Sequence, residues 1–230
     1  MTEKKDSVIY VNVAPRGENT GHSATFLDEN VSCKEPVKAK KWPNGTPFGY
    51  FYHGQTLVVA SIDGYTLSLL KKFNITNKIN VMDIPTVMDY AISKDMFPAD
   101  MRDFVVLSQF RSNDFVPRAC YWLHKGIDLP YEELSFDKVL DAPKTIWFID
   151  IFGNCKTTLL PKDIDFEVGK KISLSFGEAT MYNRLKDVPN GELAVTIGSS
   201  GYHKDRFLEI VIQGKSVAKK FNISSGQSIF

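Results

Sequence analysis

Three short segments of the chain carry residues whose types and spacing could do chemistry. Residues 145–160 read TIWFIDIFGNCKTTLL and set an acid, an aromatic and an asparagine around one glycine in an apolar, strand-like run. Residues 198–201 read Gly-Ser-Ser-Gly, and such a run can present backbone N–H groups and hydroxyls to a carboxylate or a phosphate. Residues 110–114 read FRSND and place Arg111 at the start of an expected helix, where an anion can bind. All three segments are therefore candidates for ligand binding.

Each segment also has an ordinary structural interpretation. The Phe-Gly-Asn at residues 152–154 could be a hairpin turn, because glycine and asparagine tolerate positive φ. The Gly-Ser run could be a tight connection between two strands, which composition alone favours. Asn113 or Asp114 could simply cap a helix. Asp150 is harder to explain, since a carboxylate within an apolar strand must be hydrogen-bonded or lie at the rim.

Composition and motifs exclude several classes of protein. The sequence contains no GxSxG, P-loop or HExxH motif. Its three cysteines are far apart, and no Cys/His pair has the spacing of zinc ligands, so we expect no metal site and a reducing compartment. A net charge of +1 creates no strong field for nucleic acid, and no apolar run is long enough for a membrane helix. Because the first residues also lack a signal peptide, we expect a cytoplasmic protein with neither nucleic-acid nor membrane partners.

The elements that must position the candidate residues change in character near residue 143. The 230 residues allow one large domain or two small ones. Residues 1–143 are expected to form an α/β domain, and residues 144–230 a small all-β domain of short, regularly spaced strands. The strands expected in the second domain are 145–151, 155–160, 171–176, 192–198, 206–213 and 227–230, with one helical turn at 216–221.

In the first domain, alternating apolar residues predict strands at 7–13, 48–52 and 56–62. A short helix is expected at 67–73, and the clearest helical pattern covers 114–125. Other parts are expected to be irregular: 14–30 as a long loop, and 82–101, which contains two prolines.

Five segments of the chain follow one another in the order and spacing of a known family. WFIDIFGN is similar to the pattern IDxFGN, and GELAVTIGSSGYHKDRFLEIVIQGKSVAKKF is similar to a closing block with a Gly-Ser segment and an LEI strand. Upstream, FRSNDFVPRACYWLHKGIDL is similar to FHGRDxFAP, VNVAPRG to VVDPGVG, and SIDGYTLSLL to PDNGLLS. Together they resemble the S-adenosylmethionine hydroxide adenosyltransferases, the family that includes the fluorinating and chlorinating enzymes. The resemblance covers most of residues 8–230.

This resemblance implies a homotrimer. Its larger N-terminal domain would hold a parallel-type sheet with helices, and its smaller C-terminal domain would be β-barrel-like. S-adenosylmethionine would lie between the first domain of one subunit and the second domain of a neighbour. The implied chemistry is displacement at the ribose 5′ carbon by water or halide, which releases methionine. It needs no cofactor or metal, because the sulfonium is already a good leaving group and the enzyme aligns and desolvates the nucleophile.

The resemblance also implies ligand-binding residues in the C-terminal domain. Phe152 and Asn154 match residues that meet adenine and the methionine end of the ligand. Ser199 and Ser200 match the segment that approaches the methionine carboxylate. Ala218 matches a turn on the adenine side. This half of the site is therefore expected to be retained.

The N-terminal side departs from the family. The Asp, Arg and His that position water there fall on Ala14, near Gly21 and on Arg111, whereas Asp114 is retained. The chain also starts where the family is already some way in, so we expect an α/β domain truncated at its start, which a separate chain could complete. Arg111 and Asp114 are the remaining catalytic candidates, and Asp150 matches an aspartate expected to be structural.

Three hypotheses stay open at this point. The protein could cleave S-adenosylmethionine to adenosine and methionine with a replaced nucleophile apparatus. It could instead be a catalytically inactive relative that binds an adenosyl ligand or completes a site with a partner chain. It could also be a structural oligomer that keeps only the fold. The lost water-positioning residues weigh against the first hypothesis, and the retained ligand-side residues weigh against the third.

Overall fold

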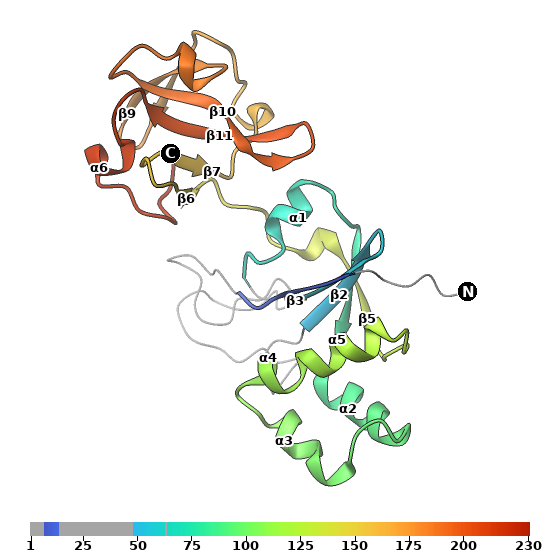
Figure 1. Cartoon of the computed structure of the whole chain (residues 1–230). Coiled ribbons are helices and arrows are strands. Elements are labelled where there is room, and N and C mark those ends of the chain that lie inside the picture. The colour runs from blue at the N-terminus through green and yellow to red at the C-terminus, as the bar shows by residue number, and fades with distance from the viewer. Residues whose placement is uncertain (1–6, 14–47, 63) are drawn as a thin grey trace. The chain divides into compact units, whose positions relative to one another are not determined.

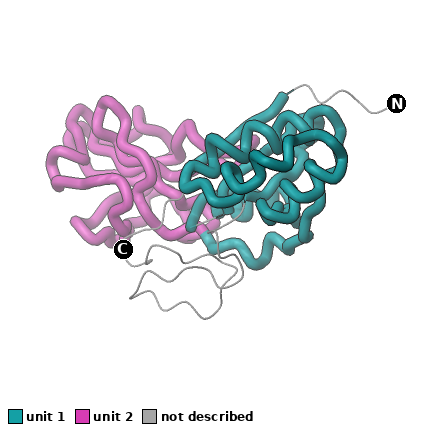
Figure 2. The backbone as a smooth tube through the Cα atoms, turned by 90° about the horizontal axis from the view of Figure 1, so that it is seen from below, with its two compact units in different colours: residues 1–141 teal, residues 142–230 magenta. Residues whose placement is uncertain are grey.

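The chain forms two compact units in the computed structural model, which describes residues 7–13, 48–62 and 64–230 (Figures 1 and 2). Unit 1 is Met1–Asp141 and unit 2 is Ala142–Phe230. The division falls two residues before the boundary near residue 143 that the change in sequence character indicates. The expected loop at 14–30, together with Ala14 and Gly21, lies outside the described residues.

Unit 1 is built on a five-stranded sheet with the order β1-β3-β2-β4-β5. The strands are β1 (Ser7–Val11), β2 (Phe48–His53), β3 (Thr56–Ser61), β4 (Lys78–Met82) and β5 (Glu132–Ser135). Only the β1–β3 pair is parallel among these described strands, and the other neighbours are antiparallel. The expected parallel-type sheet is therefore wrong. The centre of the observed sheet is an antiparallel β2–β3 hairpin, whose short turn contains Gly54 at a φ of +57°.

Short helices cover this sheet on both faces, with α1 on one face and α2 to α5 on the other (Figure 1). They are α1 (Ser68–Lys72), α2 (Ile84–Ser93), α3 (Arg102–Val106), α4 (Arg111–Asp114) and α5 (Val116–His124), with 3₁₀ turns η1 (Ala99–Met101) and η2 (Phe136–Lys138). The expectation of an irregular stretch over 82–101 is wrong, because α2 occupies half of it. Asp83 caps α2 by accepting the Thr86 N–H at 3.2 Å, and Pro85 stands in the first turn, where it removes no helical hydrogen bond. None of the helices in the described ranges has the length and apolarity needed to cross a membrane.

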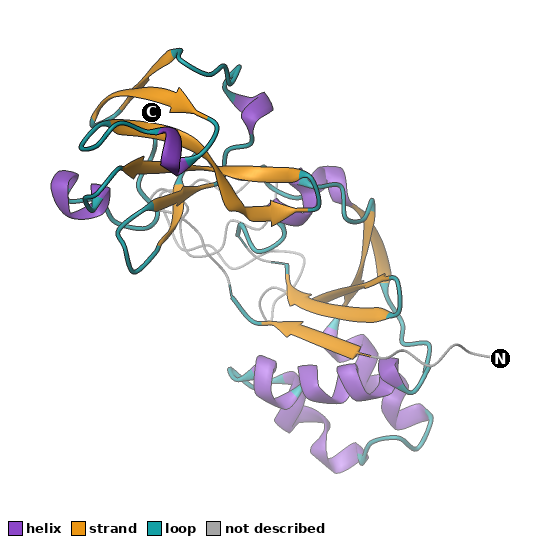
Figure 3. Cartoon of the chain, turned by 45° about the horizontal axis from the view of Figure 1, so that its top comes forward, coloured by secondary structure: helices purple, strands orange, loops and turns teal. Residues whose placement is uncertain are grey.

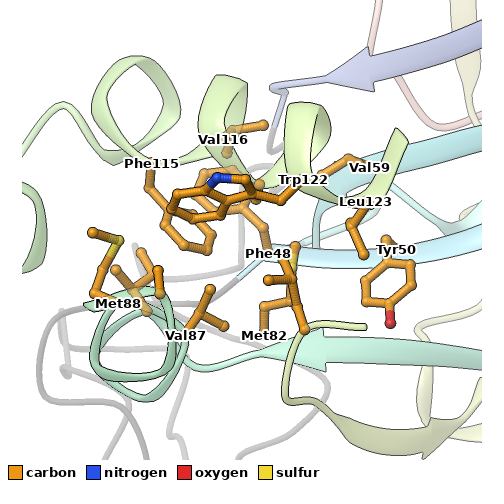
Figure 4. Packing of buried hydrophobic residues seen from close by; sticks show 14 of the residues in the cluster. Phe48, Tyr50, Val59, Met82, Val87, Met88, Phe115, Val116, Trp122 and Leu123 are labelled. Atoms are coloured by element: carbon orange, nitrogen blue, oxygen red, sulfur yellow. The ribbon is translucent and has the colours of Figure 1, made fainter. Parts of the chain in front are cut away.

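Alternation along β2 divides the core of unit 1 between the two faces of the sheet. Phe48 and Tyr50 point toward α2 and α5, where Phe48 lies 6.4 Å from Phe115 between ring centroids (Figure 4). Phe51 points to the opposite face and contacts Phe136, at 6.4 Å between centroids. This two-residue period is what a strand buried on both faces requires.

Unit 2 consists mostly of strands and loops (Figure 3). Its six-stranded mixed sheet has the order β6-β7-β11-β10-β9-β8. The elements are β6 (Ile146–Ile149), β7 (Cys155–Thr157), η3 (Pro161–Asp163), β8 (Lys171–Leu174), β9 (Gly177–Tyr182), η4 (Leu185–Asp187), β10 (Leu193–Tyr202), β11 (Asp205–Ile212) and α6 (Val217–Phe221). Buried apolar side chains from each of these strands, Cys155 in the case of β7, form one core cluster. The expected sheet-rich second domain is present, with β9 as a strand that the sequence pattern did not predict.

The last residues of the chain touch both edges of this sheet. The Gly226 N–H donates to the Ile146 carbonyl on edge strand β6 at 2.8 Å. The Ser175 N–H, just after edge strand β8, donates to the Ile229 carbonyl at 2.9 Å. The segment expected as a strand at 227–230 thus makes one isolated bridge, Thr145 with Ser228, rather than a ladder. Contacts of this kind are what a barrel-like closure would need, and the barrel itself stays a prediction.

Candidate functional site

Asp150 organises the turn between β6 and β7. Its Oδ1 accepts the backbone N–H groups of Phe152 and Asn154, each at 2.9 Å, and its Oδ2 accepts the Asn154 side-chain amide at 3.1 Å. The Gly153 N–H donates to the Asp150 carbonyl at 2.9 Å. The hairpin interpretation of this segment is therefore correct, and Asp150 is fully engaged in holding it. The turn leaves Phe152 72% exposed.

The start of α6 is attached to this turn. The Ala218 N–H donates to the Gly153 carbonyl at 3.1 Å, and the Ala218 side chain packs against the core cluster of unit 2. Ser216 caps α6 by accepting the Lys219 N–H at 3.1 Å. Ala218 thus lies beside the Phe152 segment, as expected for a shared site, and it contacts that segment through its backbone.

A hollow of about 440 Å³ lies between the turn and the loop that leads from β11 into α6. It is lined by Phe152, Asn154, Leu185, Ile212, Gln213, Gly214, Lys215 and Ser216. Apolar side chains can contact a flat ring here, and amide, ammonium and hydroxyl groups can hydrogen-bond its edges. Residues 212–216 and Leu185 were not expected from the sequence. The one sequence signal for this loop is Gln213-Gly214, because a glycine between a strand and a helix indicates a turn.

Ser199 and Ser200 do not line this hollow. The Gly-Ser run is not a tight connection between strands, because β10 continues through it as far as Tyr202. The pairing of β10 with β11 shifts register across this run, and Ser199 is held from both sides. Its N–H donates to Glu209 at 3.2 Å, and its carbonyl accepts from Arg206 at 3.1 Å. The structure therefore brings Phe152, Asn154 and Ala218 together and places the two serines farther along the sheet.

Asp114, one of the two catalytic candidates of unit 1, lines a separate hollow of about 510 Å³. It is lined by Asp103, Phe104, Leu107, Ser108, Gln109, Phe110, Asn113 and Asp114. The Asp114 carboxylate is buried, and it accepts the Ser108 hydroxyl and, at 3.1 Å, the Asn113 side-chain amide. Neither Asn113 nor Asp114 caps α5, so the capping interpretation is wrong. Arg111 begins α4 and is not among the residues that line the hollow.

Neither described cysteine is suited to be a nucleophile. Burial raises the pKa of the Cys120 thiol to about 11. Burial, with a smaller contribution from the charge of Asp150, raises the pKa of the Cys155 thiol to about 11 as well. The thiolate is the reactive form, and little of it is present near neutral pH at such values. Chemistry at the Phe152 hollow therefore cannot rest on Cys155, although it lies next to Asn154 in the chain.

These features define a two-unit protein whose second unit is a small, sheet-rich domain with a hollow between a strand hairpin and a short helix. Residues 144–230 match the family model of the SAM hydroxide adenosyltransferase C-terminal domain. The match supports the family predicted from the sequence over residues 144–230, which are the part of the chain that the family model covers.

Two solved structures resemble the chain. A conserved uncharacterized protein from Thermotoga maritima has 18% sequence identity and a TM-score of 0.48, with 79% of this chain and 69% of that chain covered. A conserved hypothetical protein from Thermus thermophilus has 16% identity and a TM-score of 0.47, with 79% and 65% covered. No curated protein matches the chain.

Proposed function

We propose that unit 2 binds an adenosyl ligand, S-adenosylmethionine or a compound derived from it, in the hollow beside Phe152. This proposal is supported by the position of the hollow, which lies within the residues that match the family model. The family match over residues 144–230 includes a preformed turn that presents Phe152 and Asn154 at a hollow of about 440 Å³. Phe152 is 72% exposed there, so its ring is accessible to a ligand.

The geometry suggests how the ligand is held. The exposed Phe152 ring offers a face on which a purine can stack. The hydrogen bond from the Asn154 amide to Asp150 fixes the orientation of that amide before any ligand arrives. Leu185 and Ile212 supply apolar contact on the other side of the hollow. A purine nucleoside has the flat, apolar faces and polar edges that these groups fit.

Cleavage of S-adenosylmethionine is a second candidate function, and Asp114 is the observation in its favour. In this reaction an oxygen of water forms a bond to the ribose 5′ carbon, and the bond from that carbon to sulfur breaks. The electron pair of the broken bond goes to sulfur, methionine leaves, and a base takes the proton of the water. Asp114 is a buried carboxylate beside a hollow, which is the environment of a general base, and Arg111 is the candidate for orienting the nucleophile.

One experiment separates the candidate functions. The full chain is titrated with S-adenosylmethionine and with adenosine by calorimetry, and the same mixtures are assayed for released adenosine and methionine. Binding without product supports the ligand-binding protein, and product supports the enzyme. Asp114→Asn should abolish product formation while leaving adenosine binding unchanged. A chain that shows neither heat nor product is a structural relative, and the proposed function is then wrong.

We also propose that the working form is a homotrimer in the cytoplasm, as the family resemblance implies. Light scattering on the purified chain should give three times the mass of one chain, which is 26.0 kDa. A monomer that binds no ligand until a second gene product is added would instead support a site completed by a partner chain.

A further inference from the structure

Of the residues that line the hollow beside Phe152, only Lys215 is charged. The others are apolar or neutral polar residues and one glycine. Lys215 is exposed, and it makes no ion pair with any residue in the described part of the chain. A ligand in this hollow can therefore meet an ammonium group that no carboxylate of these residues neutralises.

A tight turn after β11 fixes the backbone of Lys215 at the hollow. Its N–H donates to the Ile212 carbonyl at 3.1 Å, and the two residues form an isolated bridge. Between them, Gly214 has a φ of +79°, in the left-handed region that favours glycine. The Gly191 N–H donates to the Gln213 carbonyl at 2.9 Å and holds the turn from outside. The base of the lysine side chain is thus in place before a ligand arrives.

The carboxylates on the segments around the hollow have other partners. Asp150 accepts backbone N–H groups of its own turn. Asp187, at the end of η4, accepts from the Arg184 guanidinium at 2.9 Å. Glu192 accepts the Tyr182 hydroxyl at 3.1 Å. None of these three carboxylates pairs with the ammonium group in the hollow.

The loop and helix that follow β11 are positively charged. Residues 212–221 contain Lys215, Lys219 and Lys220 and no acidic residue, although the whole chain has a net charge of only +1. A local excess of positive charge attracts anions. Neither Lys219 nor Lys220 lines the hollow, so Lys215 is the lysine of this segment that can contact a ligand there.

We infer that the hollow favours adenosyl compounds that carry a phosphate on the ribose, and that Lys215 binds this phosphate. The inference rests on the proposed function, because Phe152 must take the adenine, and it adds the class of ligand. A lysine ammonium binds phosphate as a compact charge with several N–H donors. The neighbouring Ser216 hydroxyl accepts the Lys219 N–H through a lone pair, so its hydrogen can be donated to the same phosphate.

The first test compares adenosine with its monophosphates on the unmodified full chain. Adenosine 5′-monophosphate and adenosine 3′-monophosphate differ from adenosine only in the position where the anion is added. By calorimetry, at least one of them should bind about tenfold or more tightly than adenosine. The one that gains affinity shows which side of the ribose faces Lys215. Inorganic phosphate should bind about tenfold or more weakly than that monophosphate, because it lacks the adenine.

Matched variants then test the role of Lys215. Lys215→Met should weaken binding of the favoured monophosphate about tenfold and leave adenosine within about twofold, which also shows that the hollow is intact. Lys215→Arg keeps the positive charge and should restore most of the affinity. Lys219→Met is the control, because it removes the same charge from the same segment at a residue that does not line the hollow. It should leave the monophosphate affinity within about twofold.

Ionic strength provides an independent measurement. The advantage of the monophosphate over adenosine should shrink when the salt concentration is raised from about 0.1 M to about 1 M, because the screening length falls from about 10 Å to about 3 Å. Adenosine is uncharged, so its affinity should depend little on salt. In Lys215→Met, the two compounds should bind about equally at both salt concentrations.

The outcomes distinguish the two proposals. If the unmodified protein binds none of S-adenosylmethionine, adenosine and the monophosphates, the proposed function is overturned and the role of Lys215 with it. If adenosine binds and neither monophosphate binds more tightly, the role of Lys215 alone is overturned. It is also overturned if Lys215→Met keeps the advantage of the monophosphate, or if Lys219→Met loses as much of it. Inorganic phosphate that binds as tightly as the monophosphate would overturn it too, because the anion would then bind without the adenine.

Discussion

Gly153 and Ser216 approach so closely that no side chain fits between them. A Cβ atom at Gly153 would lie 1.9 Å from the Ser216 Oγ and 2.6 Å from its Cβ. Gly153 belongs to the β6–β7 turn, and Ser216 is the cap of α6. This contact is therefore what brings the Phe152 turn against the loop 212–216, so that both line one hollow.

Gly153→Ala is expected to destabilise unit 2 by about 2–4 kcal/mol. The φ of Gly153 is +81°, which costs an alanine about 1–2 kcal/mol, and the clash with Ser216 adds to that cost. The matched control is Gly169→Ala, where φ is +85° and nothing lies within 4 Å of the added Cβ. The free energy of unfolding can be measured from denaturant-dependent hydrogen exchange of β10 and β11. If both variants lose the same free energy of unfolding, the close contact with Ser216 does not contribute to the cost of the substitution.

Phe152→Ala is expected to weaken adenosine binding without changing stability. Loss of a stacking ring costs about 1–3 kcal/mol of binding free energy, and a ring that is 72% exposed contributes little to folding, within about 0.5 kcal/mol. Ile151→Ala is the control, since Ile151 is adjacent, 93% exposed and not part of the hollow. Calorimetry and thermal unfolding give the two quantities. Equal effects of the two substitutions on affinity would place the ligand elsewhere.

The chemistry of the site could be predicted in part, because it depends on local sequence. Gly153 and Asn154 marked a turn, and Asp150 needed hydrogen bonds, which the turn provides. The other wall of the hollow could not be predicted. Its residues are brought there by the contact between Gly153 and Ser216, which are 63 positions apart in the chain and share no local pattern. The separation of Ser199 from the hollow likewise depends on a strand register.

The fold could be predicted where the residue pattern of a single segment determines its secondary structure. It could not be predicted where the structure depends on how strands pair with one another. Strands such as Ser7–Val11 and Thr56–Ser61 follow from their alternation and β-branched residues. Helix α2 is hard to predict because a proline such as Pro85 usually ends a helix, whereas here it lies in the first turn after the capping residue Asp83. The direction of the unit 1 strands was wrong because it came from the resemblance, and nothing in a single strand indicates whether its neighbour is parallel.

The stability of unit 1 is expected to depend on pH through Asp89. Two hydrogen bonds from the Arg102 guanidinium lower the pKa of the Asp89 carboxyl in the folded state. The pair therefore stabilises the fold above the unfolded pKa of about 3.9, and this contribution is lost as pH falls through the lower folded pKa. Because 57% of the Asp89 side chain is exposed, the contribution is at most about 1 kcal/mol.

Asp89→Asn tests this dependence. The variant should be less stable than the unmodified protein at pH 7, and the difference should shrink toward zero as the pH is lowered to about 3 and below. Urea unfolding at a series of pH values measures it. Asp100→Asn, on the adjacent turn η1, is the control, because Asp100 forms no ion pair with any described residue. A stability difference that stays constant with pH would contradict the assignment to the ionised Asp89.

Asp150→Ala is expected to loosen the Phe152 turn and to weaken ligand binding through that turn. Asp150 accepts two backbone N–H groups at 2.9 Å, and loss of such an acceptor costs about 1–3 kcal/mol where the donors are partly buried. Asp150→Asn is the matched control, because its oxygen can still accept both N–H groups while only the bond from the Asn154 amide at 3.1 Å is lost. Hydrogen exchange of residues 150–154 and adenosine calorimetry should rank the proteins in the same order, with the unmodified chain tightest and Asp150→Ala weakest. If exchange becomes faster in Asp150→Ala while adenosine still binds with unchanged affinity, the ordered turn is not what presents Phe152 to a ligand.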